Sequence, residues 1–282
     1  MRSPWARVIP SLLVGVVLLA DNAEAQSWRT VTKTRQASGE ERLDVHVEYG
    51  AGRFQVRPGE PGSLYRMELT YDEEEFEPLA SFDGFSLELG VDGHSGSINL
   101  GKGENRSRMD LWLSTAVPMD LSLEFGAVAA DLDLGGIPLT SLSMKTGASE
   151  TTLVISEPNR EMMRSAELEV GAAAFTIRQL GNLNAERLRI EAAVGDVSLD
   201  FTGQWVRGAE VDVELGLGAL ELIFPRSLGV RIIRDTFLTS MDADGFTRNG
   251  DEYLSENWDD AEVRVTVDVE AAFGTIDVGW VR

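Results

Sequence analysis

A shift in the alternation of apolar and polar residues constrains the fold of this chain more than any other feature. In residues 211–222, apolar side chains recur at every second position from Val211 to Leu217, which places them on one face of a β-strand. The next apolar residue, Leu220, comes three positions after Leu217. If the residues on both sides of this shift face one core, the backbone must turn or bulge near Gly218. We therefore expect a bent strand whose apolar residues, Leu217 included, all lie in the core.

Six other segments of the chain repeat this shift. In each, the residue just before the last apolar residue of the first half is never larger than alanine. In chain order these small residues are Gly50, Gly126, Gly147, Gly171, Ala193, Gly216 and Ala272. The residues after them, also expected in the core, are Ala51, Ala127, Ala148, Ala172, Val194, Leu217 and Phe273.

From residue 109 onward these units follow one another at a period of roughly 22 residues, which is typical of stacked repeats. One unit cannot cover its own apolar face, so each needs neighbours that pair with its backbone. We therefore predict an all-β fold, a single-stranded β-solenoid of stacked turns, with an N-terminal β segment and a C-terminal hairpin and closing strand.

The domain organisation follows from shifts in composition. Residues 1–25 read as a signal peptide, with two arginines, an apolar run and a small-x-small cleavage site before Gln26. We expect a linker at 26–42, an N-terminal β segment at 43–108 and the solenoid domain at 109–282. Within that last domain the rhythm stops after Pro225, a hairpin is expected about Asn249-Gly250, and residues 263–278 are expected to close the stack.

Composition narrows the classes of partner. The formal net charge is −22 in 282 residues, which argues against nucleic acid and anionic membrane surfaces as partners. Beyond the signal no apolar run is long enough to span a bilayer, so no membrane span is expected in the mature chain. The chain has no cysteine, so no disulfide stabilises it.

Four motifs suggest chemistry and fail on inspection. The consecutive acids at 72–75 lack the alternation of a calcium loop, and the calcium-like opening at 242–245 has no closing acid. Residues 93–97 resemble a nucleophile elbow, but Ser97 stands where a glycine is required. His46 and His94 are the only histidines, and we expect both at the surface rather than in a triad or a zinc site. We accordingly predict no catalytic residue, no cofactor and no metal.

Two further sets of residues leave an alternative open. Glu169, Glu191 and Glu214 occupy matching outward places in successive units and would form a ladder of carboxylates. Such a ladder could serve a polysaccharide-cleaving enzyme, which needs two carboxyl groups about 5–10 Å apart, or it could be a solvated surface. Four tryptophans could stack on sugars, although packing in the core or at a cap is expected: Trp112, Trp205, Trp258 and Trp280.

The pattern resembles the bacterial toast-rack group, which includes the LiaF-like C-terminal and adhesin-type β-solenoid domains. Residues 43–52, 64–66 and 71–72 look like the N-terminal toast-rack segment. Residues 117–121 lead into a Gly-Ala unit. Residues 245–246, 249–253 and 272–276 look like the end of the LiaF-like domain. The resemblance implies an envelope protein, linked in some relatives to cell-wall antibiotic stress, without assigned catalytic residues. The chain departs from LiaF-type regulators by lacking their membrane-spanning helices, so no functional residue can be carried over.

The sequence thus predicts a non-enzymatic exported scaffold or binding protein of the cell envelope, in the periplasm or outside the cell. Its expected partner is an envelope protein, a glycan or another copy of itself. A polysaccharide-binding or polysaccharide-cleaving enzyme is the alternative.

Overall fold

The computed structural model describes residues 27–93 and 106–281, which form fifteen strands and one short 3₁₀ helix, η1 (Leu180–Leu183). The fold is all-β. The predicted signal peptide at 1–25, His94 and most of the loop at 93–97 lie outside the described residues.

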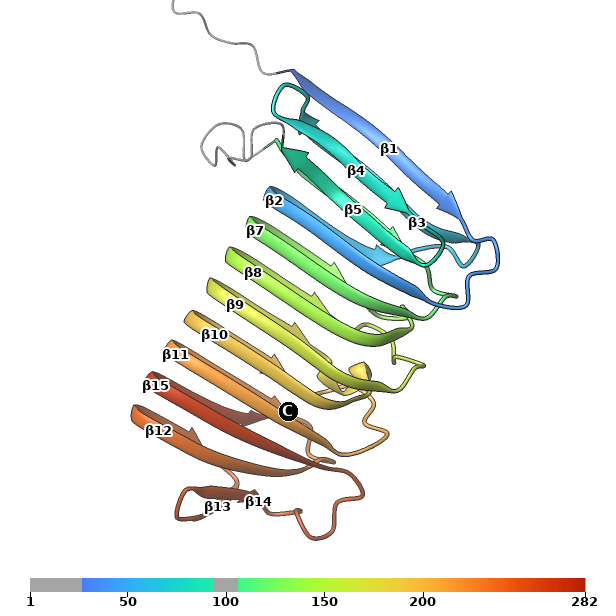
Figure 1. Cartoon of the computed structure of the whole chain (residues 1–282). Coiled ribbons are helices and arrows are strands. Elements are labelled where there is room, and N and C mark those ends of the chain that lie inside the picture. The colour runs from blue at the N-terminus through green and yellow to red at the C-terminus, as the bar shows by residue number, and fades with distance from the viewer. Residues whose placement is uncertain (1–26, 94–105, 282) are drawn as a thin grey trace, which may run out of the picture.

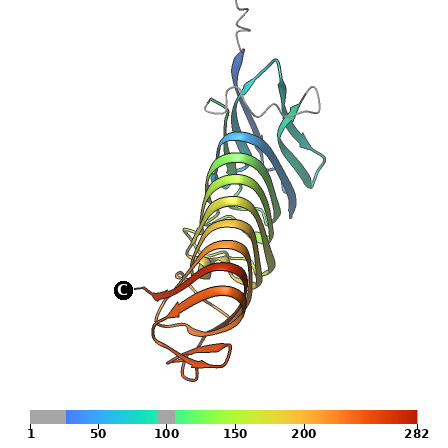
Figure 2. The same ribbon diagram turned by 90° about the vertical axis from the view of Figure 1, so that its left-hand side faces the viewer.

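Eight long strands pair in parallel and give the molecule its shape. In spatial order they are β2 (Leu43–Pro58), β7 (Met119–Asp133), β8 (Leu139–Val154), β9 (Met163–Arg178), β10 (Ala185–Asp200), β11 (Ala209–Phe224), β15 (Arg264–Trp280) and β12 (Gly229–Ala243). We call this series the parallel stack. Each strand bends in its middle, so that Figure 2 shows a row of nested arches and Figure 1 shows the same strands running side by side. Because the register is maintained from strand to strand, equivalent residues form columns, as Ile190, Val213 and Val269 do in the core.

The predicted column of small residues is confirmed. Gly50 lies next to Gly126 in the register of β2 and β7, and Gly147 lies next to Gly171 in that of β8 and β9. A Cβ atom built on Gly171 would lie 2.8 Å from the carbonyl oxygen of Gly147. Successive arches therefore approach too closely at this column for larger residues in most of the strands.

The residues expected at the end of the first apolar row are not in the core. Leu217 is 51% exposed, Val194 45% and Phe273 45%, and their equivalents Ala148 and Ala172 are exposed as well. The prediction that they face inward was wrong because each follows the small residue at the turn of the arch. The small residue and the residue after it both lie on the outside of the bend. The next buried position is Leu220 or its equivalent in most strands, and Val128 or Ser149 in β7 and β8.

The N-terminal end of the parallel stack carries further strands. β5 (Ser86–Gly93) pairs with the first half of β2, and β4 (Phe76–Phe82) pairs with β5. β6 (Arg108–Leu113) pairs with the second half of β2, followed outward by β3 (Ser63–Asp72) and β1 (Trp28–Gln36). The predicted linker at 26–42 is therefore corrected, since most of it is strand β1, whose polar side chains suit an exposed edge. The sheet also runs without a break across the predicted domain boundary at 108/109, because β2 pairs with both β6 and β7.

At the C-terminal end the spatial order of the strands differs from the expected order. β12 continues the stack, although the rhythm was expected to stop after Pro225, and β15 is inserted between β11 and β12 rather than closing the stack. The pattern was hard to see in β12 because its inward positions include Arg234 and Thr236, next to Val269 and Ala271 of β15. The predicted hairpin at Asn249-Gly250 is confirmed by β13 (Phe246–Asn249) and β14 (Glu252–Ser255), and β14 pairs with β12.

Among the described residues, no helix has the length and apolar character required to cross a membrane.

Candidate functional site

The outer face of the parallel stack carries an open groove of about 700 Å³ beside the bend. Its floor is the column of small residues, formed here by Gly171, Ala193, Gly216 and Ala272. Because these residues have small side chains or none, the backbone of β9, β10, β11 and β15 is accessible along the floor. Phe237 of β12 lines the groove at the C-terminal end of this column.

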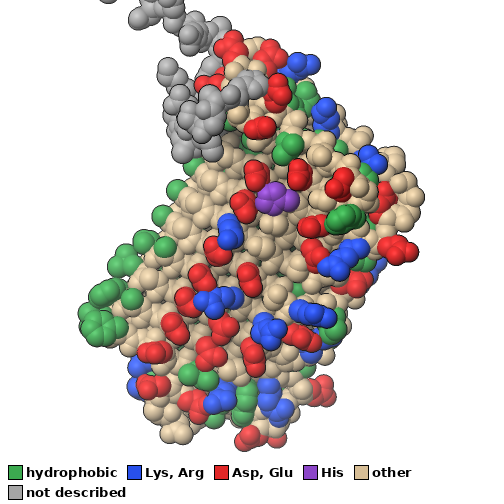
Figure 3. Space-filling view, viewed as in Figure 1, with side chains coloured by type: hydrophobic (Ala, Val, Ile, Leu, Met, Phe, Trp, Pro, Cys, Tyr) green, Lys and Arg blue, Asp and Glu red, His purple; other side chains and the backbone are tan. Residues whose placement is uncertain are grey.

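One side of the groove is a column of charged residues that we call the acidic column. The strand register places its members next to one another from β2 to β12. They are Glu48, Glu124, Lys145, Glu169, Glu191, Glu214, Glu270 and Asp235. The predicted ladder of Glu169, Glu191 and Glu214 is thus confirmed as an arrangement of neighbouring carboxylates. Arginines and lysines partly cover the same face, as Figure 3 shows.

Basic side chains neutralise the middle of the acidic column. Lys145 Nζ lies 3.1 Å from Glu169 Oε1, and this hydrogen bond raises the pKa of Lys145. Arg189 donates to Glu191 and, at 2.7 Å, to Glu214 Oε1. The bond to Glu191 is the main reason that the pKa of Arg189 is raised. These exposed pairs relieve the repulsion that stacked carboxylates would otherwise feel.

Glu270 and Asp235, at the C-terminal end of the column, have no ion-pair partner among the described residues. This end of the groove is therefore where negative charge remains uncompensated. It is also where the wall meets the exposed ring of Phe237.

A histidine that the sequence analysis treated as an isolated surface residue lies beside the opposite end of the acidic column. His46 is partly exposed, and its Nε2 lies 2.9 Å from Glu48 Oε1. His46, Glu48 and Glu124 each offer a ligand atom, and these atoms lie within 4.8 Å of one another, so the three could hold a cation. The cross-strand neighbour Glu124 becomes visible only through the pairing of β2 with β7.

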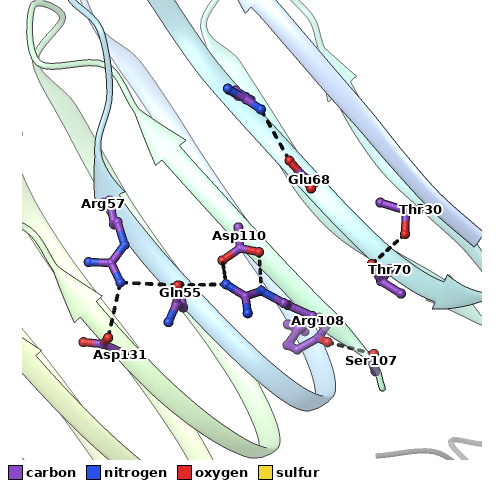
Figure 4. A network of polar contacts seen from close by, with 11 residues as sticks. Thr30, Gln55, Arg57, Glu68, Thr70, Ser107, Arg108, Asp110 and Asp131 are labelled. Atoms are coloured by element: carbon purple, nitrogen blue, oxygen red, sulfur yellow. Dashed lines mark hydrogen bonds and ion pairs between the residues drawn. The ribbon is translucent and has the colours of Figure 1, made fainter. Parts of the chain in front are cut away.

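A second set of polar contacts covers the other half of the arch at the N-terminal end. Arg108 binds Asp110 through two nitrogens, at 2.5 and 2.8 Å, and also donates to Gln55 at 3.2 Å. Arg57 links Gln55 to Asp131 of β7, each at 3.3 Å (Figure 4). The network ties β6, β2 and β7 together across the sheet. Every described charge in it has a partner within the chain, so we assign it to stability.

Trp205 and Trp280 pack against the core, in line with expectation, whereas Trp112 and Trp258 are partly exposed and lie outside it. Trp205 donates to the carbonyl of Phe201 at 2.6 Å and stacks on its ring, and Trp280 stacks on Phe246. Trp112 and Trp258 each lie beneath an arginine, with the guanidinium 5.0 and 5.8 Å from the ring centroid. The two calcium-like segments, 72–75 and 242–245, lie at turns after β3 and β12.

These observations define an all-β protein whose register-stacked strands display ordered columns of side chains. The family model described as the N-terminal domain of toast_rack, DUF2154, matches residues 22–178 and 159–223. The chain therefore belongs to the toast-rack family, as its resemblance predicted.

Comparison with solved structures gave several matches. A protein from Clostridium sporogenes, provisionally described as a cell adhesion protein, is 18% identical with a TM-score of 0.44, covering 90% of this chain and 100% of its own. A provisionally described adhesin from Bacteroides fragilis is 12% identical with a TM-score of 0.42, covering 90% and 98%. A provisionally described lipid-binding protein from Parabacteroides distasonis is 9% identical with a TM-score of 0.29, covering 89% and 97%. A comparison with curated proteins gave no match.

Proposed function

We propose that the chain is a non-enzymatic scaffold or binding protein of the cell envelope, exported by means of residues 1–25 and built on a β-solenoid. The observation that carries this proposal is the open groove, whose floor is bare backbone and whose wall repeats a similar charged side chain from strand to strand. Such a surface suits recognition of an extended partner along the stack. Use of the face in adhesion or in the response to envelope stress, and the LiaF-like character of residues 109–282, are parts of the same proposal.

The arrangement of the carboxylates favours binding over catalysis. Glycoside cleavage uses two carboxyl groups on opposite sides of the scissile bond. The described acids that line this groove form a single column, and those in its middle are neutralised by Lys145 and Arg189. A single-sided row of acids places no second carboxylate across a bound sugar.

The test uses the chain from residue 26 onward, purified and mixed with isolated envelope fractions, cell-wall glycans and a panel of hydrolase substrates. We expect cosedimentation with an envelope component and no turnover of any substrate. Turnover that disappears in the double variant E191Q/E214Q would overturn the proposal. Mass spectrometry of the protein recovered from its cells should show cleavage before Gln26, whereas an intact N-terminus in the cytosol would contradict export.

A further inference from the structure

An exposed row of large apolar side chains runs along the bends of the last strands. Val194, Leu217, Phe273 and Leu238 lie side by side in register in β10, β11, β15 and β12. Phe237 is 79% exposed, and its ring packs edge-on against Phe273 at 6.3 Å between centroids. We call these five residues the apolar ridge. Figure 3 shows hydrophobic side chains gathered along this edge of the molecule, larger toward the C-terminal strands.

The bend itself does not require these side chains. The same column holds Ala51, Ala127, Ala148 and Ala172 in β2, β7, β8 and β9, which bend in the same way. Of the nine large hydrophobic residues that are exposed in the described part of the chain, five form the apolar ridge. Exposed apolar residues gathered in one place mark interaction surfaces more often than residues scattered singly do.

The charge beside the ridge indicates what kind of partner fits. Three ridge residues, Val194, Leu217 and Phe273, each directly follow a floor residue of the groove in the sequence. The wall of the groove at this end is formed by Glu214, Glu270 and Asp235. A second copy of the chain would bring another acidic column to this face, and an anionic lipid surface would be repelled. A partner that carries both apolar and basic side chains satisfies both halves of the site.

The spacing of the strands favours a helix as the bound element. Neighbouring strands lie about 4.8 Å apart, close to the pitch of an α-helix of about 5.4 Å. An extended chain repeats its side chains on one face only every 6.6–6.8 Å or so. A helix laid along the ridge thus stays nearly in step with it over four strands.

We propose that the apolar ridge and the adjoining acidic column dock an amphipathic, basic helix of a partner protein. This inference rests on the proposed binding function and specifies the chemistry of the partner. The apolar side of the helix covers Leu217, Phe273 and Phe237. Its lysines and arginines reach Glu270 and Asp235, which have no ion-pair partner among the described residues.

The probe is a labelled 14-residue peptide, LKKLLKLLKKLLKL, whose leucines share one face of a helix. Its binding to the chain from residue 26 onward is measured by fluorescence anisotropy. The ridge variant L217S/F273S is matched by M162S/V206S, which changes two exposed apolar residues elsewhere. The charge variant D235N/E270Q is matched by D242N/D277N, which removes two carboxylates from the same two strands in the other half of the arch.

We expect the wild type and both controls to bind the probe alike, and the ridge and charge variants to bind about tenfold more weakly, which corresponds to about 1.4 kcal/mol. Thermal unfolding of each variant verifies that it is folded, and F237S/L238S replaces L217S/F273S if that variant is not. A peptide of the same length in which leucine and lysine alternate, and which therefore cannot form an amphipathic helix, should bind weakly.

Equal binding by all variants would overturn the proposal, because it would show only general attraction to an acidic protein. Ridge-dependent binding to vesicles of phosphatidylcholine would assign the ridge to a lipid surface instead. A dimer that is lost in L217S/F273S would assign it to a second copy. If the probe fails while the protein still cosediments with an envelope component, this inference falls and the proposed function stands.

Discussion

Gly218 lies at the bend of β11 with a φ angle of 149°, a conformation that other residues rarely adopt. A side chain at this position would overlap the carbonyl oxygen of Gly195 in β10. We therefore expect G218A to lower the free energy of unfolding by about 1–3 kcal/mol, measured by urea denaturation. The control is G279A in β15, where no atom lies within 4 Å of an added Cβ and where we expect little change. Equal stability of the two variants would show that the bend does not depend on glycine.

Asp120 and Asp268 are outward carboxylates whose pKa values move in opposite directions. Burial raises the pKa of Asp120, but hydrogen bonds from Thr140, Arg42 and Ser141 outweigh burial and hold it below its usual range. Burial and then the neighbouring Asp212 raise the pKa of Asp268. A lowered pKa in the folded state stabilises the protein above the usual pKa of aspartate, about 3.9, and a raised one destabilises it there.

We accordingly expect D120N to lower the free energy of unfolding at pH 7, with a loss that shrinks as the pH falls through the lowered pKa of Asp120. D268N should raise it at pH 7, with a gain that disappears as the pH falls below the usual range of aspartate. Urea denaturation at pH 7 and at about pH 2.5, which is below the usual pKa of aspartate, measures both. The account fails if the two variants change stability at pH 7 in the same direction.

At the scale of elements, buried asparagines join the loops at the ends of successive strands. Asn182 is 4% exposed, its amide donates to the carbonyl of Ile155 at 2.7 Å, and it accepts from the backbone of Gln204 at 2.7 Å. Asn159 connects Leu139 to Leu183 in the same way, at 2.8 and 3.2 Å. These amides satisfy backbone groups at the ends of strands and in the loops that follow them, and so they hold the ends of the arches together.

We expect N182A to lower the free energy of unfolding by about 2–3 kcal/mol, because it leaves buried backbone groups without a partner. The matched control is Q204A, whose side chain is exposed in a neighbouring loop. Thermal and urea unfolding of both variants give the comparison. A loss no larger than that of Q204A would mean that water replaces the amide.

At the scale of the whole molecule, the protection of backbone amides from hydrogen exchange should vary along the stack. β9, β10 and β11 pair on both sides along most of their length, whereas β1 and β13 are edge strands. We expect hydrogen exchange, followed by mass spectrometry, to be slowest in the first group and fastest in the second. Uniform exchange in all strands would show that the sheet opens as one unit rather than from its ends.

Much of the fold could be predicted from the sequence because alternation along a strand is local. The shift near Gly218, the small residues and the stacking of Glu169, Glu191 and Glu214 all follow from that alternation and its period. β1 was missed because an exposed edge strand has no buried face, so its sequence does not alternate between apolar and polar residues. The place of β12 in the parallel stack was missed because its inward positions include Arg234 and Thr236.

The candidate site was only half visible in the sequence. Glu169, Glu191 and Glu214 of the acidic column could be predicted, since they are equivalent in successive repeats. The apolar ridge could not, because Leu217 and Phe273 have the residue type of core positions and their exposure depends on how the bend turns them. The closeness of Glu124 to His46 likewise depends on a pairing between strands that lie far apart in the sequence.

The sequence by itself determined the repeating bent strand and the columns it forms, because the direction of each side chain depends on the residues beside it. The tertiary structure decided the place of β15 between β11 and β12, the addition of β1 to the edge and the outward turn of the apolar ridge. Those features depend on which strands meet, and pairing between distant segments is set by the backbone hydrogen bonds and surfaces of the assembled chain.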